Sequence, residues 1–179
     1  NIDTVKRVVK ARGASLVHGL NRMTSDVLRQ EGEKSQSGLA SIKPGQNIAA
    51  TPGAVIFRSE LLEVIQYQPI TAEVYKEPIL ILPSPINKFY ITDLYQHNSL
   101  THYLLDNGFQ VFSISWRNPK IEHRTCGLET YIQALIEASD SVRITNRQDK
   151  LNLFGFSAGG IFSAILASIF KQKGDTDIN

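Results

Sequence analysis

Cysteine is nearly absent from the sequence, as are other features that would indicate a particular class of protein. The one cysteine, Cys126, excludes an internal disulfide framework and any Cys-x-x-Cys zinc or redox site. The net charge is only +2 and the basic residues are scattered, so charge gives no argument for nucleic-acid binding. The longest apolar-rich stretch, residues 161–170, is far shorter than the roughly 20 residues that span a bilayer.

The composition that remains is that of an ordinary globular protein. Of the 179 residues, 42% are apolar and 20% are charged, which is enough for one sizeable core with an appended segment. No signal peptide opens the chain, and its first residue is Asn1 rather than Met. We therefore expect a cytoplasmic protein, seen as a piece of a longer chain.

The first part of the chain has a helical pattern followed by a polar stretch. Residues 4–30 carry apolar side chains at spacings of four, three and four, which share one helical face: Leu16, Leu20, Met23 and Val27. Gly13 and Gly19 leave open whether this is one helix or two short ones. Residues 31–53 are interpreted as a linker or irregular loop, and 54–57 and 61–67 as short strands.

After residue 76 the pattern alternates between strands and helices. Strands are expected at Ile79–Leu82, Val111–Trp116 and 151–154, and helices at 98–107, 128–143 and 158–171. Asn98 is the expected N-cap of the first helix, and Gly108 its end. This alternation predicts an α/β fold with a parallel sheet and helices on its faces.

One motif in the sequence carries chemistry: Gly-Phe-Ser-Ala-Gly at residues 155–159, followed by Gly160. In a nucleophile elbow the serine, here Ser157, lies on a strained strand-to-helix turn that exposes its hydroxyl. Side chains at Gly155 and Gly159 would collide with the incoming strand and the outgoing helix. The helix N-terminus favours negative charge, and the Ala158 N–H points at a developing oxyanion.

The five-residue pattern is weak by itself, and an alternative must be weighed. A glycine-rich turn of this kind can bind a phosphate or simply pack tightly. The sequence has neither a Walker lysine nor a Gly-x-Gly-x-x-Gly spacing, which counts against phosphate. The apolar strand before the motif and the amphipathic helix after it favour the elbow, and hence an α/β-hydrolase fold.

A nucleophilic serine needs a histidine base and an acid that orients it, in the chain order nucleophile, acid, histidine. The residues after Ser157 include Asp175 and Asp177 but no histidine. The upstream histidines are interpreted as surface or helix-face residues: His18, His97, His102 and His123. We therefore expect the catalytic triad to be incomplete in this chain.

Four segments resemble, in order, the polyhydroxyalkanoate (poly-3-hydroxybutyrate) synthase family, whose members polymerise hydroxyacyl-CoA thioesters into storage polyester. The segments are residues 47–55 with 61–69, residues 83–94 (PSPINKFYITDL), residues 111–119 (VFSISWRNP) and residues 150–160 (KLNLFGFSAGG). The resemblance implies the first half of an α/β-hydrolase catalytic domain at residues 76–179. Residues 1–75 would be the family's N-terminal region.

The loop after Ile79–Leu82 leaves its strand at the carboxyl end, where α/β folds place their sites. The resemblance implies that Ile86 or a neighbour supplies the second oxyanion N–H, with Asn87, Lys88 and Tyr90 as candidates for substrate contact. The alternatives are a rigid connection for residues 83–90 and a solvated polar patch for Asn87 and Lys88.

The sequence departs from the family at its elbow, where the family carries cysteine and this chain carries Ser157. A thiolate forms more readily and leaves more easily than an alkoxide, so serine brings the site nearer to an esterase. Cys126 lies in a loop without an elbow and is interpreted as structural. The family's acid and histidine would lie beyond Asn179.

The expected function is a polyhydroxyalkanoate synthase segment: an acyltransferase that moves a 3-hydroxyacyl group from CoA to a growing polyester. CoA is then substrate and leaving group, and we expect no cofactor, metal, nucleic-acid partner or membrane span. The resemblance also implies a homodimer located at polymer granules. The alternatives are a serine hydrolase of the same fold (a thioesterase, an esterase or a depolymerase) and a non-catalytic granule-binding relative.

Overall fold

The structure is a computed structural model that describes residues 14, 17–21, 24, 43–95 and 97–174. The chain divides into two units, residues 1–42 and residues 43–179. All described residues of the first unit are helical, in agreement with the mainly helical N-terminal region that the sequence predicts. The rest of the expected helix at 4–30, with Leu16, Met23 and Val27, and the expected linker up to residue 42 lie outside the described residues.

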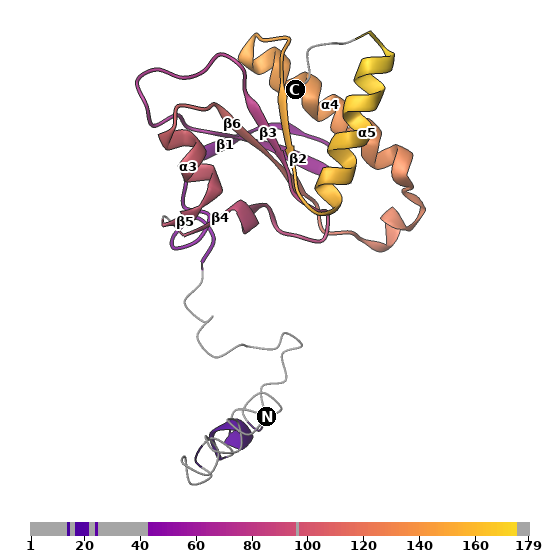
Figure 1. Ribbon diagram of the computed structural model, residues 1–179. Helices are drawn as coiled ribbons and strands as arrows, with labels where there is room; N and C mark the ends of the chain where they lie inside the picture. The colour runs from indigo at the N-terminus through magenta and orange to yellow at the C-terminus, as the bar shows by residue number, and fades with distance from the viewer. Residues whose placement is uncertain (1–13, 15–16, 22–23, 25–42, 96, 175–179) are drawn as a thin grey trace, which may run out of the picture. The chain divides into compact units, whose positions relative to one another are not determined.

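A five-stranded sheet is the centre of the second unit (Figure 1). Its order is β1 (Gly53–Arg58), β2 (Leu62–Tyr67), β6 (Val111–Trp116), β3 (Ile79–Leu82) and β7 (Asn152–Gly155). The three strands predicted after residue 76 lie side by side and parallel, with Leu80 between Phe112 and Leu153. The predicted parallel sheet is confirmed.

The first two strands extend this sheet rather than forming a separate element. β1 pairs with β2, and β2 pairs with β6, both antiparallel. The sequence predicts these strands correctly but does not place them in the sheet. The division of the chain into residues 1–75 and 76–179 remains a prediction about sequence type, and the sheet itself contains strands from both sides of residue 75.

Helices cover both faces of the sheet. α4 (Leu128–Asn146) and α5 (Ala158–Gln172) lie on one face, and α3 (Leu100–Asp106) lies on the other (Figure 1). Because successive strand residues point to opposite faces, Leu80 and Leu82 belong to the large apolar cluster under α4 and α5. Ile81 belongs to the smaller cluster with Leu105 of α3. This two-sided burial explains the continuous apolar sequence of β3.

The region between β3 and α3 differs from the expectation. A 3₁₀ helix at Phe89–Thr92 comes before β4. A second 3₁₀ helix, outside this region, follows β6 at Ile121–Thr125. A two-stranded ribbon of β4 (Asp93–Tyr95) and β5 (Asn98–Ser99) precedes α3. The predicted N-cap of α3, Asn98, is wrong: the cap is Ser99, whose hydroxyl accepts the His102 N–H at 2.9 Å. Gly108, with φ of +79°, follows the helix end as predicted.

Candidate active site

Ser157 lies on a sharp turn between β7, which ends at Gly155, and α5, which begins at Ala158. Its backbone has φ 55° and ψ −132°, a conformation that costs a residue with a side chain about 1–3 kcal/mol. The residue is exposed at the carboxyl end of β7. Gly155 pairs with Leu82, so the turn lies beside the end of β3. This is the geometry that the elbow motif predicts.

The two glycines that flank Ser157 are required by close backbone contacts. A Cβ on Gly155 would lie 2.3 Å from the Gly159 carbonyl oxygen and from Ser163 Oγ, both in the outgoing helix. A Cβ on Gly159 would lie 1.9 Å from the carbonyl oxygen of Leu82. The second collision differs from the sequence expectation, because Gly159 faces the neighbouring strand β3 and not the incoming strand β7. The two glycines thus let the helix approach both strands.

The Ala158 N–H, in the first turn of α5, has no backbone partner among the described residues. The Gly159 N–H donates to the Phe156 carbonyl and the Gly160 N–H to the Ser157 carbonyl, both at 3.0 Å. Within the part of the chain that the structure describes, the Ala158 N–H donates no hydrogen bond. A free donor at a helix N-terminus is suited to an anion, which supports but does not test the predicted role of Ala158.

The loop after β3 presents few backbone donors. Pro83 and Pro85 have no N–H, and the Asn87 N–H donates to the Ser84 carbonyl at 2.8 Å in a tight turn. Among the described residues, the N–H groups of Ser84 and Ile86 donate to no carbonyl. The Ile86 side chain is 90% exposed. Ile86 therefore keeps a free donor at the tip of the loop, and its oxyanion role stays a prediction.

The other predicted loop residues lie along the same segment. Lys88 is exposed and donates to Asn118 Oδ1, which follows β6. Tyr90 and Asn87 are half-buried, and the Tyr90 ring packs edge-on against Phe89 with 5.4 Å between centroids. Their contact with a substrate stays a prediction.

Trp116, at the end of β6, contacts this loop and was missed by the sequence reasoning as a site residue. Its indole N–H donates to the Pro83 carbonyl at 2.8 Å, in a buried position. A tryptophan at the end of a predicted buried strand does indicate such a contact, because a buried indole N–H needs an acceptor. The sequence alone gave no means of identifying that partner.

The histidines do not supply a base for Ser157 among the described residues. His18 and His97 are exposed, and His102 lies 3.6 Å from Asp106 within α3. His123 corrects the expectation of a surface histidine: it is buried, and its Nδ1 accepts the Lys120 N–H at 2.9 Å. None of the four hydrogen-bonds to Ser157 in the described part of the chain, and Asp175 and Asp177 lie outside it.

Cys126 is a half-buried free thiol that packs against the large apolar cluster. Across the described residues, no three His, Cys, Asp or Glu side chains are grouped so that they could hold a metal ion. In the same residues, no helix has the length and apolar character needed to cross a membrane.

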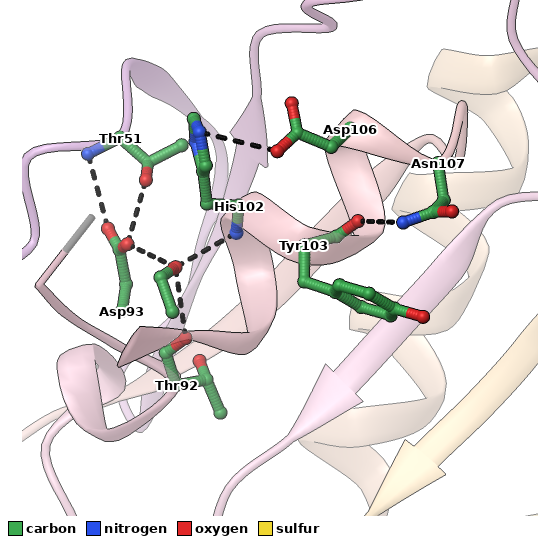
Figure 2. A network of polar contacts seen from close by, with 8 residues as sticks. Thr51, Thr92, Asp93, His102, Tyr103, Asp106 and Asn107 are labelled. Carbon is green, nitrogen blue, oxygen red and sulfur yellow. Dashed lines mark hydrogen bonds and ion pairs between the residues drawn. The ribbon is translucent and has the colours of Figure 1, made fainter. Parts of the chain in front are cut away.

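A second polar group, which the sequence did not predict, surrounds Asp93 (Figure 2). We call Asp93, Thr51 and Ser99 the Asp93 cluster. Asp93 is 3% exposed, and its Oδ1 accepts the hydroxyls of Thr51 and Ser99, each at 2.7 Å. Its Oδ2 accepts the Thr51 N–H at 3.2 Å. The cluster joins the segment before β1 to the start of α3.

A cavity and a buried tyrosine lie next to the Asp93 cluster. A cavity of about 280 Å³ is lined by Thr51 and Asp93 together with His102 and Tyr95. Burial, and then the charge of Asp93, raise the pKa of the Tyr67 phenol well above its ordinary value. The only role that these contacts define is structural.

A strained, exposed serine between a parallel strand and a helix defines the chain as an α/β-hydrolase-fold protein. A proposed esterase from Staphylococcus aureus has the same fold, with a TM-score of 0.53 and 12% identity over 89% of this chain and 48% of that one.

The family described as "Poly-beta-hydroxybutyrate polymerase (PhaC) N-terminus" matches residues 1–104. Poly(3-hydroxyalkanoate) polymerase 2 of Ectopseudomonas oleovorans is 43% identical over 94% of this chain and 30% of its own length. Poly(3-hydroxyalkanoate) polymerase 1 of the same organism is 40% identical over 100% of this chain and 32% of its own length. The chain belongs to the poly-beta-hydroxybutyrate polymerase family, and it spans about a third of the length of these relatives.

Proposed function

We propose that the protein containing this chain is an acyltransferase that polymerises 3-hydroxyacyl-CoA into polyhydroxyalkanoate. The observation that carries the proposal is Ser157, exposed on a strained elbow beside the unbonded N–H of Ala158, in a chain of the polymerase family. The relatives' names support the substrate class, since both are poly(3-hydroxyalkanoate) polymerases.

In the proposed reaction Ser157 Oγ attacks the thioester carbonyl carbon. The N–H groups of Ala158 and Ile86 hold the oxyanion, the C–S bond breaks, and CoA leaves as the thiol after receiving the serine proton through a base. The hydroxyl of a second acyl unit then attacks the carbonyl carbon of the serine ester. The bond from that carbon to Ser157 Oγ breaks, the hydroxyl proton passes through the base to Oγ, and the polyester is one unit longer. The base and its acid partner would come from residues other than those that the structure describes.

The loop after β3 is the proposed substrate contact. Lys88 supplies an exposed positive charge there, and CoA carries phosphate groups that a cation attracts. Asn87 and Tyr90 are half-buried on the same segment and present polar groups beside it. We further propose that the protein works at polymer granules in the cytoplasm and as a homodimer, as the family resemblance implies.

A second candidate function is a serine hydrolase of the same fold. The observation that favours it is the serine at the elbow itself. A serine in the Gly-x-Ser-x-Gly elbow is the nucleophile of lipases and esterases, which pass the acyl group from the serine ester to water.

The test uses the full-length protein with Ser157, Ser157→Ala and Ser157→Cys, and measures CoA release and polymer mass from 3-hydroxybutyryl-CoA. Ser157→Ala should lower CoA release by several orders of magnitude. Ser157→Cys should raise the polymer mass formed per CoA, because the exposed position of Ser157 accommodates sulfur without disturbing packing.

The outcomes separate the candidates. CoA release without polymer would identify a hydrolase, and undiminished CoA release by Ser157→Ala would contradict both candidates. The isolated 179-residue chain serves as control and should show little turnover, because no described histidine bonds to Ser157.

A further inference from the structure

We propose that Trp116 is a positioning residue that fixes the loop after β3 in the orientation needed to hold the oxyanion. The inference rests on the proposed function, since it concerns the loop that carries the Ile86 N–H. It is drawn from a contact between three elements that are separate in the sequence: the end of β6, the start of the loop and the first turns of α5.

The hydrogen bond at the root of the loop defines one peptide plane. Trp116 is 8% exposed, and its indole N–H donates to the Pro83 carbonyl at 2.8 Å. Because a peptide unit is planar, fixing the Pro83 carbonyl also fixes the direction of the Ser84 N–H. The loop towards Ile86 therefore leaves β3 in one direction.

The same side chain also contacts the helix that follows Ser157. The Trp116 ring lies 5.8 Å from the Phe162 ring of α5 and 5.6 Å from the Tyr131 ring of α4, measured between centroids. A Cβ on Gly159 of the same helix would lie 3.1 Å from the Pro83 carbonyl carbon. The start of the loop is therefore near both Gly159, in α5, and Trp116, whose ring packs on α5.

A second, weaker contact holds the far part of the loop. Lys88 donates to Asn118, two residues after Trp116, and the Ser84–Asn87 turn lies between the two contacts. Both side chains are exposed, so this hydrogen bond contributes less than the buried one. The end of β6 and the segment after it therefore hold the loop at two points, and the Trp116 contact is the larger contribution.

The expected consequence is a loss of transition-state stabilisation without a loss of substrate binding. Removing one oxyanion donor costs about 100- to 1,000-fold in kcat, and a misplacement near 1 Å costs about 100-fold. We expect the loss of the indole N–H to lower kcat about 10- to 100-fold with KM unchanged. Binding of a trifluoromethyl ketone analogue of the thioester, which forms a tetrahedral adduct, should weaken by the same factor.

The experiment uses the full-length protein with β-(3-benzothienyl)alanine at position 116. This residue keeps the two fused rings and replaces the N–H with sulfur, so packing against Phe162 and Tyr131 is retained. Trp116→Phe is a second, genetically encoded variant. Tyr131→Leu is the matched control, because it removes a ring that packs on Trp116 and leaves the Pro83 hydrogen bond in place.

We expect kcat and ketone affinity to fall together in both position-116 variants, whereas Tyr131→Leu should lower stability and leave both kcat and ketone affinity nearly unchanged. A fall in kcat with unchanged ketone affinity, or no fall in kcat, would overturn it. Ser157→Ala distinguishes a failure of the proposed function from a failure of the proposed role of Trp116. If that variant keeps its acyl transfer, the proposed function fails; if only the position-116 variants are unaffected, the role of Trp116 fails alone.

Discussion

The elbow at Ser157 and the Asp93 cluster are stabilised in opposite ways. At the elbow, the helix approaches the strands so closely that there is no room for a Cβ at Gly155 or at Gly159. In the Asp93 cluster, a buried carboxylate is surrounded by hydroxyls that approach to 2.7 Å. The elbow contains a strained residue, and the Asp93 cluster satisfies its buried charge with three hydrogen bonds.

The difference is the one expected between a proposed catalytic site and a site that contributes to stability. Strain and an unbonded N–H reduce stability, and they persist at the elbow because β3, β7 and α5 pack around it. The Asp93 carboxylate accepts three hydrogen bonds from residues 51 and 99, so it mainly holds chain segments together. The following changes test this comparison, from the largest expected effect to the smallest.

Gly159→Ala should destabilise the chain most, by about 3 kcal/mol or more, because the added Cβ collides with the backbone of Leu82 and not with a movable side chain. Gly160→Ala is the matched control. Its Cβ would lie 3.3 Å from the nearest atom, so we expect a change within about 1 kcal/mol. Urea unfolding followed by Trp116 fluorescence measures both. Equal effects of the two substitutions would contradict the close approach of α5 to β3.

Asp93→Asn should cost about 2 kcal/mol, because its amide replaces one acceptor with a donor beside the Thr51 and Ser99 donors. The control, Asp106→Asn, removes an exposed charge 3.6 Å from His102 and should change stability by less than about 0.5 kcal/mol. The same unfolding measurement applies. If Asp93→Asn left the free energy of unfolding unchanged, the buried carboxylate would not be what joins Thr51 to α3.

Ser157→Gly should stabilise the chain by about 1 kcal/mol, because glycine adopts the backbone angles of residue 157 without strain and this gain exceeds its extra flexibility when unfolded. Ser157→Ala keeps a Cβ at the same angles and should leave stability nearly unchanged. Both variants lack the hydroxyl, so a difference in their urea midpoints isolates backbone strain. No difference would show that the elbow is not strained.

The elbow could be predicted from the sequence and the Asp93 cluster could not, for a physical reason. Strand, turn and helix around Ser157 are adjacent in sequence, and their glycines mark the turn. Thr51 and Asp93 are 42 residues apart, and neither belongs to a pattern that would suggest contact. The N-cap of α3 was predicted wrongly for the same reason. Both Asn98 and Ser99 suit an N-cap, and only the hydrogen bond to Asp93 favours Ser99.

Contacts between residues far apart in the sequence could not be predicted within the sheet either. The sequence predicts β1 and β2 as strands, but their antiparallel pairing onto β6 depends on a register that no local signal contains. The position of the proposed oxyanion loop follows from the strand before it, whereas its hydrogen bond to Trp116 joins residues 33 apart.

The edge strand β7 has a consequence for how this chain behaves at high concentration. At the opposite edge of the sheet, β1 has an irregular register and ends in Arg58, two features that discourage pairing with another molecule. β7 reads Asn-Leu-Phe-Gly, without charge or proline, and Phe154 is 41% exposed. No strand of the described residues pairs with its outer edge, which can therefore accept a strand from another copy. Self-association of concentrated samples should therefore begin at β7, and a lysine in place of Phe154 would be the first substitution to try in keeping the chain monodisperse.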